Sequence, residues 1–194
     1  AFTQVGGGIL NARLGYVKGL TAFGALRDAD NLPRDLPHAQ FRKLTVDLGF
    51  SRRFSVSDRA YLWSSQFSGQ HAYDTLYGSQ QMLIGGSSSV RGFLNSVLSG
   101  DSGSYLRNEL SMPWHITLAN GSPLSGRVYT GFDVGHVGNR ASGVPSGTLS
   151  GATLGASVQW KTLSLDAFAA RAIDLPHTLK REGTLYGFRL SASL

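Results

Sequence analysis

Hydrophobic and polar residues alternate along most of the chain, which is the pattern of a β-strand with one apolar and one polar face. Between residues 42 and 54, Leu44, Val46, Leu48 and Phe50 occupy even positions, whereas the odd positions are polar or glycine. The same alternation, regular or less regular, occurs in segments 10–16, 58–72, 102–114, 125–135, 152–161, 163–172 and 184–194. The sequence therefore predicts eight strands, and no segment has a convincing helical periodicity.

The apolar faces of these strands have no predicted cover. Charged residues make up 15% of the chain, against roughly 25% in typical globular proteins. A transmembrane β-barrel, with apolar side chains toward lipid and polar ones toward the lumen, fits this pattern. Aromatic residues lie near strand ends, as interfacial girdles require: Tyr16, Phe54, Tyr61, Trp63, Trp114, Trp160 and Tyr186. A soluble all-β lectin or jelly roll is the alternative at this point.

Loop lengths favour the membrane barrel. The long connections are about 19–38, 74–100, 136–148 and 173–183, and they alternate with short ones near 55–57, 116–123 and 161–163. Outer-membrane barrels have long external loops and short periplasmic turns. Both ends of the chain are then expected on the periplasmic side.

Composition excludes several classes of protein. The 194 residues include no cysteine, so a disulfide scaffold, a zinc–thiolate site and a thiol nucleophile are excluded. The net charge of +6 comes from scattered basic residues, which argues against nucleic-acid binding. No run of about 18 apolar residues predicts a transmembrane helix. The opening AFTQVGGG is unlike a signal peptide, and we expect a fragment of a longer protein.

Three possible chemical sites are incomplete. The segment GDSGS at residues 100–104 is like the surroundings of a protease serine, but no supported histidine base accompanies it. The glycine-rich stretch at 85–92 lacks the Gly-Lys-Ser/Thr ending of a phosphate-binding loop. The five histidines have no metal-ligand spacing. We therefore expect no catalytic residue, no metal and no cofactor.

The connection at residues 74–100 is the longest and the most informative. Unstructured connections of this length are uncommon unless they are functional or disordered. This one is too apolar for solvent, since it contains Met82, Leu83, Ile84, Val90, Phe93 and Leu94. In a barrel such a loop is expected to fold inward and be buried in the lumen. The interior of an eight-stranded barrel is filled by its own side chains, so a wider barrel is needed.

Three ordered motifs resemble one family over nearly the whole chain. LIGGSSSVRGF at 83–93 resembles the lumen loop of the TpsB transporters of two-partner secretion, within the superfamily that includes the BamA assembly factor. SGDSGSYLRNEL at 99–110 is similar to the strand that follows this loop. YTGFDVGHV at 129–137 is similar to a later strand, although its aromatic residue lies next to Asp133 rather than two positions earlier.

The resemblance implies an architecture and a function. Residues 1–194 would be the C-terminal eight strands of a sixteen-stranded barrel, without the first eight strands, the plug helix and the POTRA domains. The function implied is a pore in the bacterial outer membrane that secretes an unfolded exoprotein of the haemolysin or adhesin type. Its partners would be that exoprotein and outer-membrane lipid. The alternatives are a BamA-like barrel-assembly factor and an outer-membrane lipase or protease, for which a catalytic set is missing.

The resemblance also places Arg91 against the strand that carries Asp133. The alternation along this strand agrees. Val128, Phe132 and Val134 share the apolar face toward lipid, so Asp133 lies on the opposite face and points inward. We predict an Arg91–Asp133 latch with Glu109 as a second candidate partner; a solvated Arg91 in a surface loop is the alternative. The residues expected to form the loop motif and its seat are Gly85, Gly86, Val90, Arg91, Gly92, Phe93, Asp133 and Gly135, with Arg107 and Glu109 as lumen-facing support.

Overall fold

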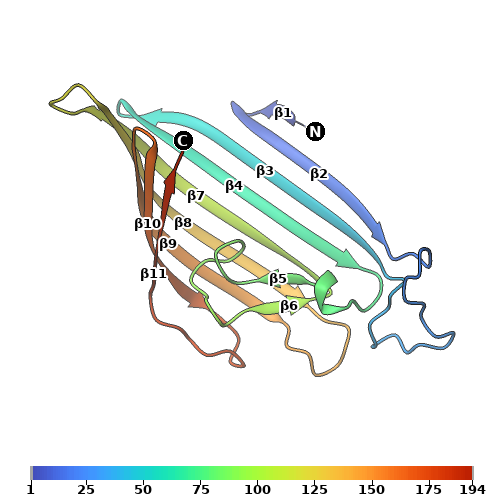
Figure 1. Cartoon of the computed structure of the whole chain (residues 1–194). Helices are drawn as coiled ribbons and strands as arrows, with labels where there is room; N and C mark the ends of the chain where they lie inside the picture. The colour runs from blue at the N-terminus through green and yellow to red at the C-terminus, as the bar shows by residue number, and fades with distance from the viewer. Residues whose placement is uncertain (1, 194) are drawn as a thin grey trace.

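The computed structural model describes residues 2–193, which form an all-β, antiparallel structure (Figure 1). One curved sheet contains nine strands in the order β1-β2-β3-β4-β7-β8-β9-β10-β11. Their bounds are β1 (Phe2–Val5), β2 (Gly8–Lys18), β3 (Arg42–Val56), β4 (Arg59–Ala72), β7 (Ser102–Thr117), β8 (Pro123–Gly138), β9 (Gly147–Trp160), β10 (Leu163–Asp174) and β11 (Leu185–Ala192). Between β4 and β7 the chain forms a 3-10 turn, η1 (Gly78–Gln80), and a small ribbon of β5 (Met82–Ile84) and β6 (Leu98–Gly100).

The eight predicted strands correspond to β2, β3, β4 and β7 to β11, but the predicted count was incomplete. β1 adds a ninth strand to the sheet, and β5 and β6 form a second sheet of two strands. These three elements span three or four residues each, which is too short for alternation to be detected. Leu194, predicted on an apolar face, lies outside the described residues.

The two faces of the sheet differ as the alternation predicts. The convex face carries apolar side chains that are open to the surroundings, such as Leu14, Leu154 and Phe188, with exposed fractions of 78%, 67% and 77%. Aromatic pairs lie across neighbouring strands on this face, and the Phe54 and Tyr61 rings stack with centroids 5.6 Å apart. Such a continuous exposed apolar surface is not typical of a soluble monomer.

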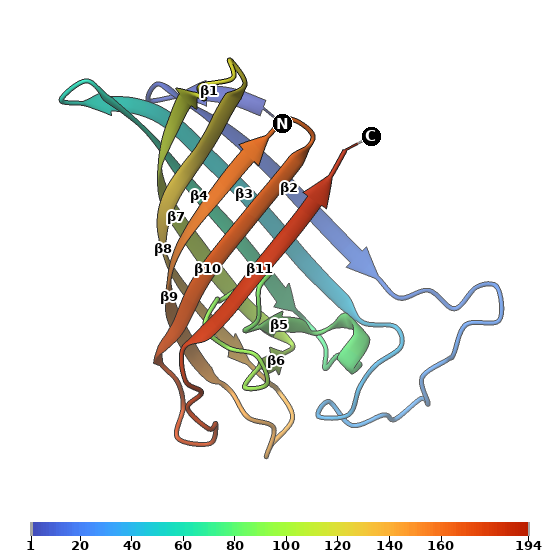
Figure 2. The same ribbon diagram turned by 60° about the vertical axis from the view of Figure 1, so that its left-hand side comes forward.

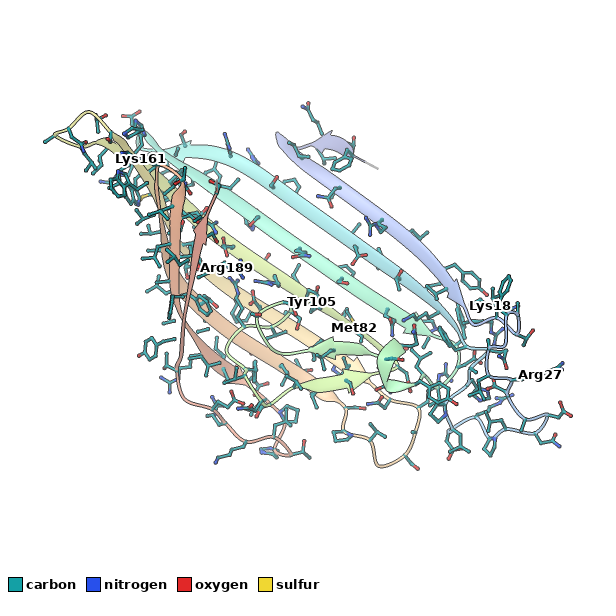
Figure 3. The ribbon with its side chains drawn as sticks, viewed as in Figure 1. Lys18, Arg27, Met82, Tyr105, Lys161 and Arg189 are labelled. Carbon is teal, nitrogen blue, oxygen red and sulfur yellow. The ribbon has the colours of Figure 1, made fainter. Side chains whose placement is uncertain are left out.

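Loop length is segregated between the two ends of the sheet (Figures 1 and 2). Two-residue turns join β1 to β2, β3 to β4 and β9 to β10. In the β3–β4 turn, Ser57 and Asp58 both have positive φ, 49° and 63°, as a type I′ hairpin turn requires. The long connections lie at the opposite end, and Figure 3 shows Lys161 at the short-turn end, away from Lys18 and Arg27. Both chain ends are on the short-turn side.

The main apolar core lies where the β4–β7 connection packs on the concave face. Ile84, Val90, Phe93 and Leu98 from the connection are at most 3% exposed and contact Val137, Leu149 and Ala172 of the wall. Of the six apolar loop residues that the sequence singled out, Ile84, Val90 and Phe93 are buried and Met82 is partly buried. Leu83 and Leu94 are 53% and 68% exposed.

No helix within residues 2–193 is long and apolar enough to cross a bilayer.

Candidate functional site

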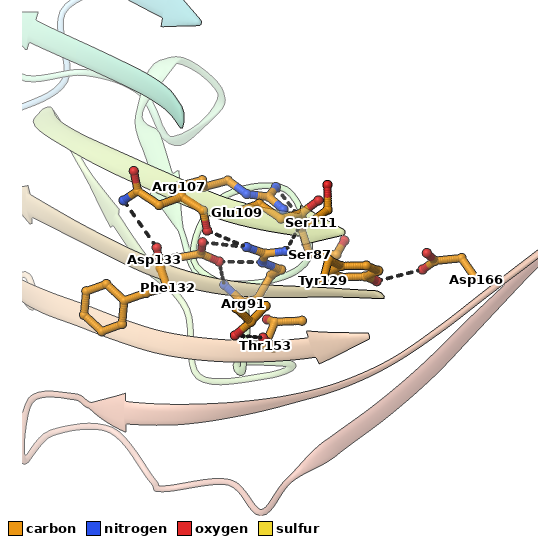
Figure 4. Close-up of polar contacts among 12 residues, drawn as sticks. Ser87, Arg91, Arg107, Glu109, Ser111, Tyr129, Phe132, Asp133, Thr153 and Asp166 are labelled. Carbon is orange, nitrogen blue, oxygen red and sulfur yellow. Dashed lines mark hydrogen bonds and ion pairs between the residues drawn. The ribbon is translucent and has the colours of Figure 1, made fainter. Parts of the chain in front are cut away.

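Arg91 lies at the tip of the loop between β5 and β6 and forms the central contact of the site (Figure 4). Its Nε donates to Oδ2 of Asp133 at 2.7 Å, and its Nη2 donates to Oδ1 at 2.8 Å. The backbone N–H of Arg91 donates to the same Oδ2 at 3.0 Å. Both carboxylate oxygens are thus bound by one residue, in the bidentate geometry that Arg and carboxylate favour.

Burial makes this ion pair costly to break. The Asp133 side chain is fully buried and that of Arg91 is 9% exposed. Burial alone would lower the pKa of the Arg91 guanidinium, but Asp133 and Glu109 outweigh it and raise that pKa above its ordinary value. A buried pair adds little net stability, whereas removal of one partner leaves an uncompensated charge at a cost of about 3–5 kcal/mol.

Glu109 extends the pair into a network. Its Oε2 accepts from Nη1 of Arg91 at 3.0 Å, and its Oε1 accepts from Nη1 of Arg127 at 2.7 Å. Arg91 therefore contacts both carboxylates that the sequence singled out. Arg107, predicted as lumen-facing support, bonds to the loop rather than to these carboxylates, since its Nη1 donates to the carbonyl of Ser87 at 2.9 Å.

Glycines shape both sides of this contact. On the loop, Gly85, Gly86 and Gly92 have φ of 101°, 86° and 100°, which lies in the region that only glycine adopts without strain. On the wall, a Cβ at Gly135 would lie 3.0 Å from Cγ2 of Val90 and 3.2 Å from Cγ2 of Ile84. The loop can therefore approach the backbone of β8.

Two further wall glycines were not expected from the sequence. A Cβ at Gly131 would collide with the guanidinium of Arg91, and one at Gly151 would collide with the Arg91 carbonyl. The alternation pattern places both glycines on the inward face. Gly131 is two residues before Asp133 on the same strand, and Gly151 pairs with Asp133 across β8 and β9. Several other glycines follow the same pattern, so parity alone would not have separated these two.

Two loop carboxylates that support the site were also missed. Asp101, 1% exposed, accepts from the backbone N–H groups of Leu76 and Arg140 and from the side chain of Gln81. Asp101 belongs to the GDSGS segment, and its place in the structure is a junction between loops. The second carboxylate is Glu182, which binds the returning half of the β5–β6 loop.

Beside the ion-pair network, the concave face has an open cavity of about 710 Å³. Its lining includes Arg127, Tyr129, Asp166 and Arg189, and the Tyr129 hydroxyl donates to Oδ1 of Asp166 at 3.0 Å. Residues 2–193 hold no group of three or more His, Asp or Glu side chains placed to bind a metal ion. The ion pairs of Arg91 attach the loop electrostatically to the strands of the concave face.

Comparison with known proteins agrees with this architecture. Residues 1–158 match the family model of haemolysin secretion/activation protein ShlB/FhaC/HecB. The chain is 32% identical over 191 residues to the outer membrane transporter CdiB of Dickeya dadantii, covering 96% of this chain and 32% of the relative. It is 31% identical over 172 residues to the hemolysin transporter protein HpmB of Proteus mirabilis, covering 88% of this chain and 29% of the relative.

A solved structure shows the same fold. CdiB from Escherichia coli superposes with a TM-score of 0.85 at 32% sequence identity, covering 98% of this chain and 34% of that one. The chain thus spans about a third of the length of the relatives it matches. The family model matches most of the chain, and the antiparallel sheet with its packed loop superposes on a solved structure of a relative. The chain therefore belongs to the ShlB/FhaC/HecB haemolysin secretion/activation family.

Proposed function

We propose that this chain is the C-terminal half of a sixteen-stranded barrel in the bacterial outer membrane, and that the whole protein is a two-partner secretion pore for a large unfolded exoprotein of the haemolysin or adhesin type. Its convex apolar face contacts lipid, and its concave polar face lines the translocation path. The relatives are named as outer membrane and hemolysin transporters, which supports transport rather than catalysis.

The open sheet supports a larger assembly. Within the described residues, β11 pairs with β10 alone and β1, at the other edge of the sheet, pairs with β2 alone. Unpaired backbone groups are not tolerated in lipid. Further strands, supplied by an N-terminal barrel half, would close the ring, and POTRA domains would precede that half.

The observation that carries the proposed mechanism is the buried Arg91–Asp133 pair, with Asp133 fully enclosed. A loop fixed in the translocation path must leave for a polypeptide to pass. An ion pair suits this task, because its bonds are strong when seated and both charges regain water when the loop moves out. Glu109 and Arg107 hold the same loop from the wall of β7.

The test uses Asp133→Ala in the full-length transporter together with its exoprotein. The variant removes the main partner of the Arg91 guanidinium, so the seated position of the loop is destabilised by about 3–5 kcal/mol. We expect the variant to insert into the outer membrane in normal amount and secretion to be lost, because a loop that cannot return to its seat has no defined position in the translocation path. Measurements are the exoprotein in culture medium and the transporter in purified outer membranes.

The matched control is Asp47→Ala. Asp47 is a concave-face carboxylate of β3 that accepts from the Ser68 hydroxyl and does not contact the loop. Secretion should be retained in this control. Normal secretion by Asp133→Ala would contradict the proposed role of the latch.

A further inference from the structure

The connection between β10 and β11, residues 175–184, binds the inward-folded loop next to the segment that Asp133 binds. Oε2 of Glu182 accepts from the backbone N–H of Leu94 at 2.7 Å. Oε1 accepts from the N–H groups of Asn95 and Ser96 at 2.8 Å and 2.7 Å. Three successive N–H groups directed at one carboxylate form an anion-binding nest, and this nest is occupied within the chain itself.

Neighbouring contacts keep Glu182 in place. The Ser96 hydroxyl donates to the carbonyl of Lys180 at 2.7 Å. Arg181 fastens the connection to the end of β10, where its Nη1 and Nη2 donate to the carbonyls of Ala172 and Ile173, both at 3.1 Å. Leu179 packs against the apolar core that contains Phe93. The carboxylate is thus presented by a braced segment.

The charge of Glu182 is maintained by the loop that it binds. Partial burial acts to raise the pKa of this carboxyl, but the N–H groups of Leu94, Asn95 and Ser96 outweigh it and hold the pKa below its ordinary value. Glu182 is therefore ionised at neutral pH, and its bonds to the loop are charge-assisted, which makes them stronger than neutral ones.

The two carboxylates hold adjacent segments of the loop from different elements. Asp133, on β8, binds Arg91 in the tip, and Glu182, beyond β10, binds the three residues that directly follow Phe93. The tip cannot leave the wall as a unit while the segment next to it remains bound.

We propose that Glu182 is a second anchor of the β5–β6 loop, a positioning residue that sets how readily this loop leaves the lumen. This inference rests on the proposed function, because it assumes that the loop moves during transport. The β10–β11 connection would thus control loop movement together with the Arg91–Asp133 pair.

The test measures loop exposure directly in the full-length transporter, with any other cysteine removed. Ser89→Cys places a reporter in the tip, where the native side chain is 3% exposed and bonds only to the Gly85 carbonyl. A membrane-impermeant maleimide then reports how often the tip leaves its seat. Adding Glu182→Gln should raise the labelling rate about tenfold, since charge-assisted bonds are replaced by weaker ones, and Glu182→Ala should raise it further.

Asp174→Asn is the matched control, because it removes the same charge from the end of β10 without touching the loop; its labelling rate should equal that of the reporter alone. Equal labelling with and without Glu182→Gln and Glu182→Ala would overturn the proposal. The readout is independent of secretion. If these variants expose the reporter while Asp133→Ala secretes normally, the proposed function fails and the anchor stands.

Discussion

Arg91 and the glycines that surround it show how single residues make the site possible. The guanidinium and the backbone of Arg91 lie so close to the wall that β8 and β9 have no side chain at the nearest positions, Gly131 and Gly151. β-branched residues at these two positions would have a higher strand propensity, but their side chains would keep the loop away from Asp133. Glycine lowers the strand propensity of the wall here and allows the close contact.

Gly151→Ala tests this contact. The added methyl group would collide with the Arg91 carbonyl, which is backbone and cannot rotate away, so the loop must shift and its bonds to Asp133 lengthen. Overpacking of this kind costs about 1–3 kcal/mol. We expect faster cleavage of the loop in limited proteolysis of the full-length protein. Gly138→Ala is the control, because an added Cβ there meets no atom within 4 Å; equal cleavage of both variants would be evidence against the tight seat.

Strand residues of the site were predictable from periodicity and the residues of the loop motif from the family resemblance, whereas two carboxylates in other connections were not predictable. The period of two places Asp133, Glu109 and Arg107 on the concave face without any structural information, because a strand directs alternate side chains to opposite faces. Glu182 and Asp101 belong to connections without periodicity. Glu182 binds Ser96, 86 residues earlier in the chain, and Asp101 binds Leu76, 25 residues earlier. No local sequence pattern encodes contacts of that kind.

At the scale of elements, the β5–β6 ribbon shows how an apolar loop is held on a polar wall. Two three-residue strands pair Met82 with Gly100 and Ile84 with Leu98, and the segment between them carries Val90 and Phe93 into the core. A ribbon this short is not stable alone. Its stability comes from the wall, which explains why the sequence indicated only a long connection there.

Phe93→Ala tests the apolar part of this attachment. Phe93 is 2% exposed in the core, and loss of a buried phenyl ring costs about 3–5 kcal/mol. We expect the loop to be released and cut by protease under conditions that leave the unaltered protein intact. Leu94→Ala is a control on the adjacent residue, which is 68% exposed, and should change loop stability by less than about 0.5 kcal/mol. The idea fails if both variants behave alike.

At the scale of the whole molecule, the sheet is inverted relative to a soluble protein. Its outward side chains are apolar and exposed, and its concave face carries the ion pairs and the cavity. Alternation predicted the two faces, and loop length predicted which ends of the strands lie together. Neither could predict β1, because a four-residue strand before a Gly-Gly turn leaves too little sequence to show a period.

Leu154→Arg tests the orientation of the sheet. Leu154 lies in β9 on the convex face and is 67% exposed. An arginine on the lipid face near the midplane costs a barrel about 2–4 kcal/mol, so the full-length variant should insert less into lipid vesicles. Ser157→Arg, three residues along the strand, directs the same side chain into the concave cavity and should insert normally. Equal insertion of both variants would show that the faces are assigned wrongly.

The charges that surround the seated loop also determine what remains when the loop departs. Next to the seated loop, the neighbouring strands β7 and β8 carry Arg107 and Arg127 together with Glu109 and Asp133. Arg127 is already bonded to Glu109, and Arg107 lies directly opposite Asp133 in the β7–β8 register. In the proposed transport cycle, departure of the loop would release Arg107 from the Ser87 carbonyl and allow it to turn toward Asp133. Under the proposed function, the vacated surface would balance its own charges, so that the loop could return and a passing polypeptide would meet paired charges at this level.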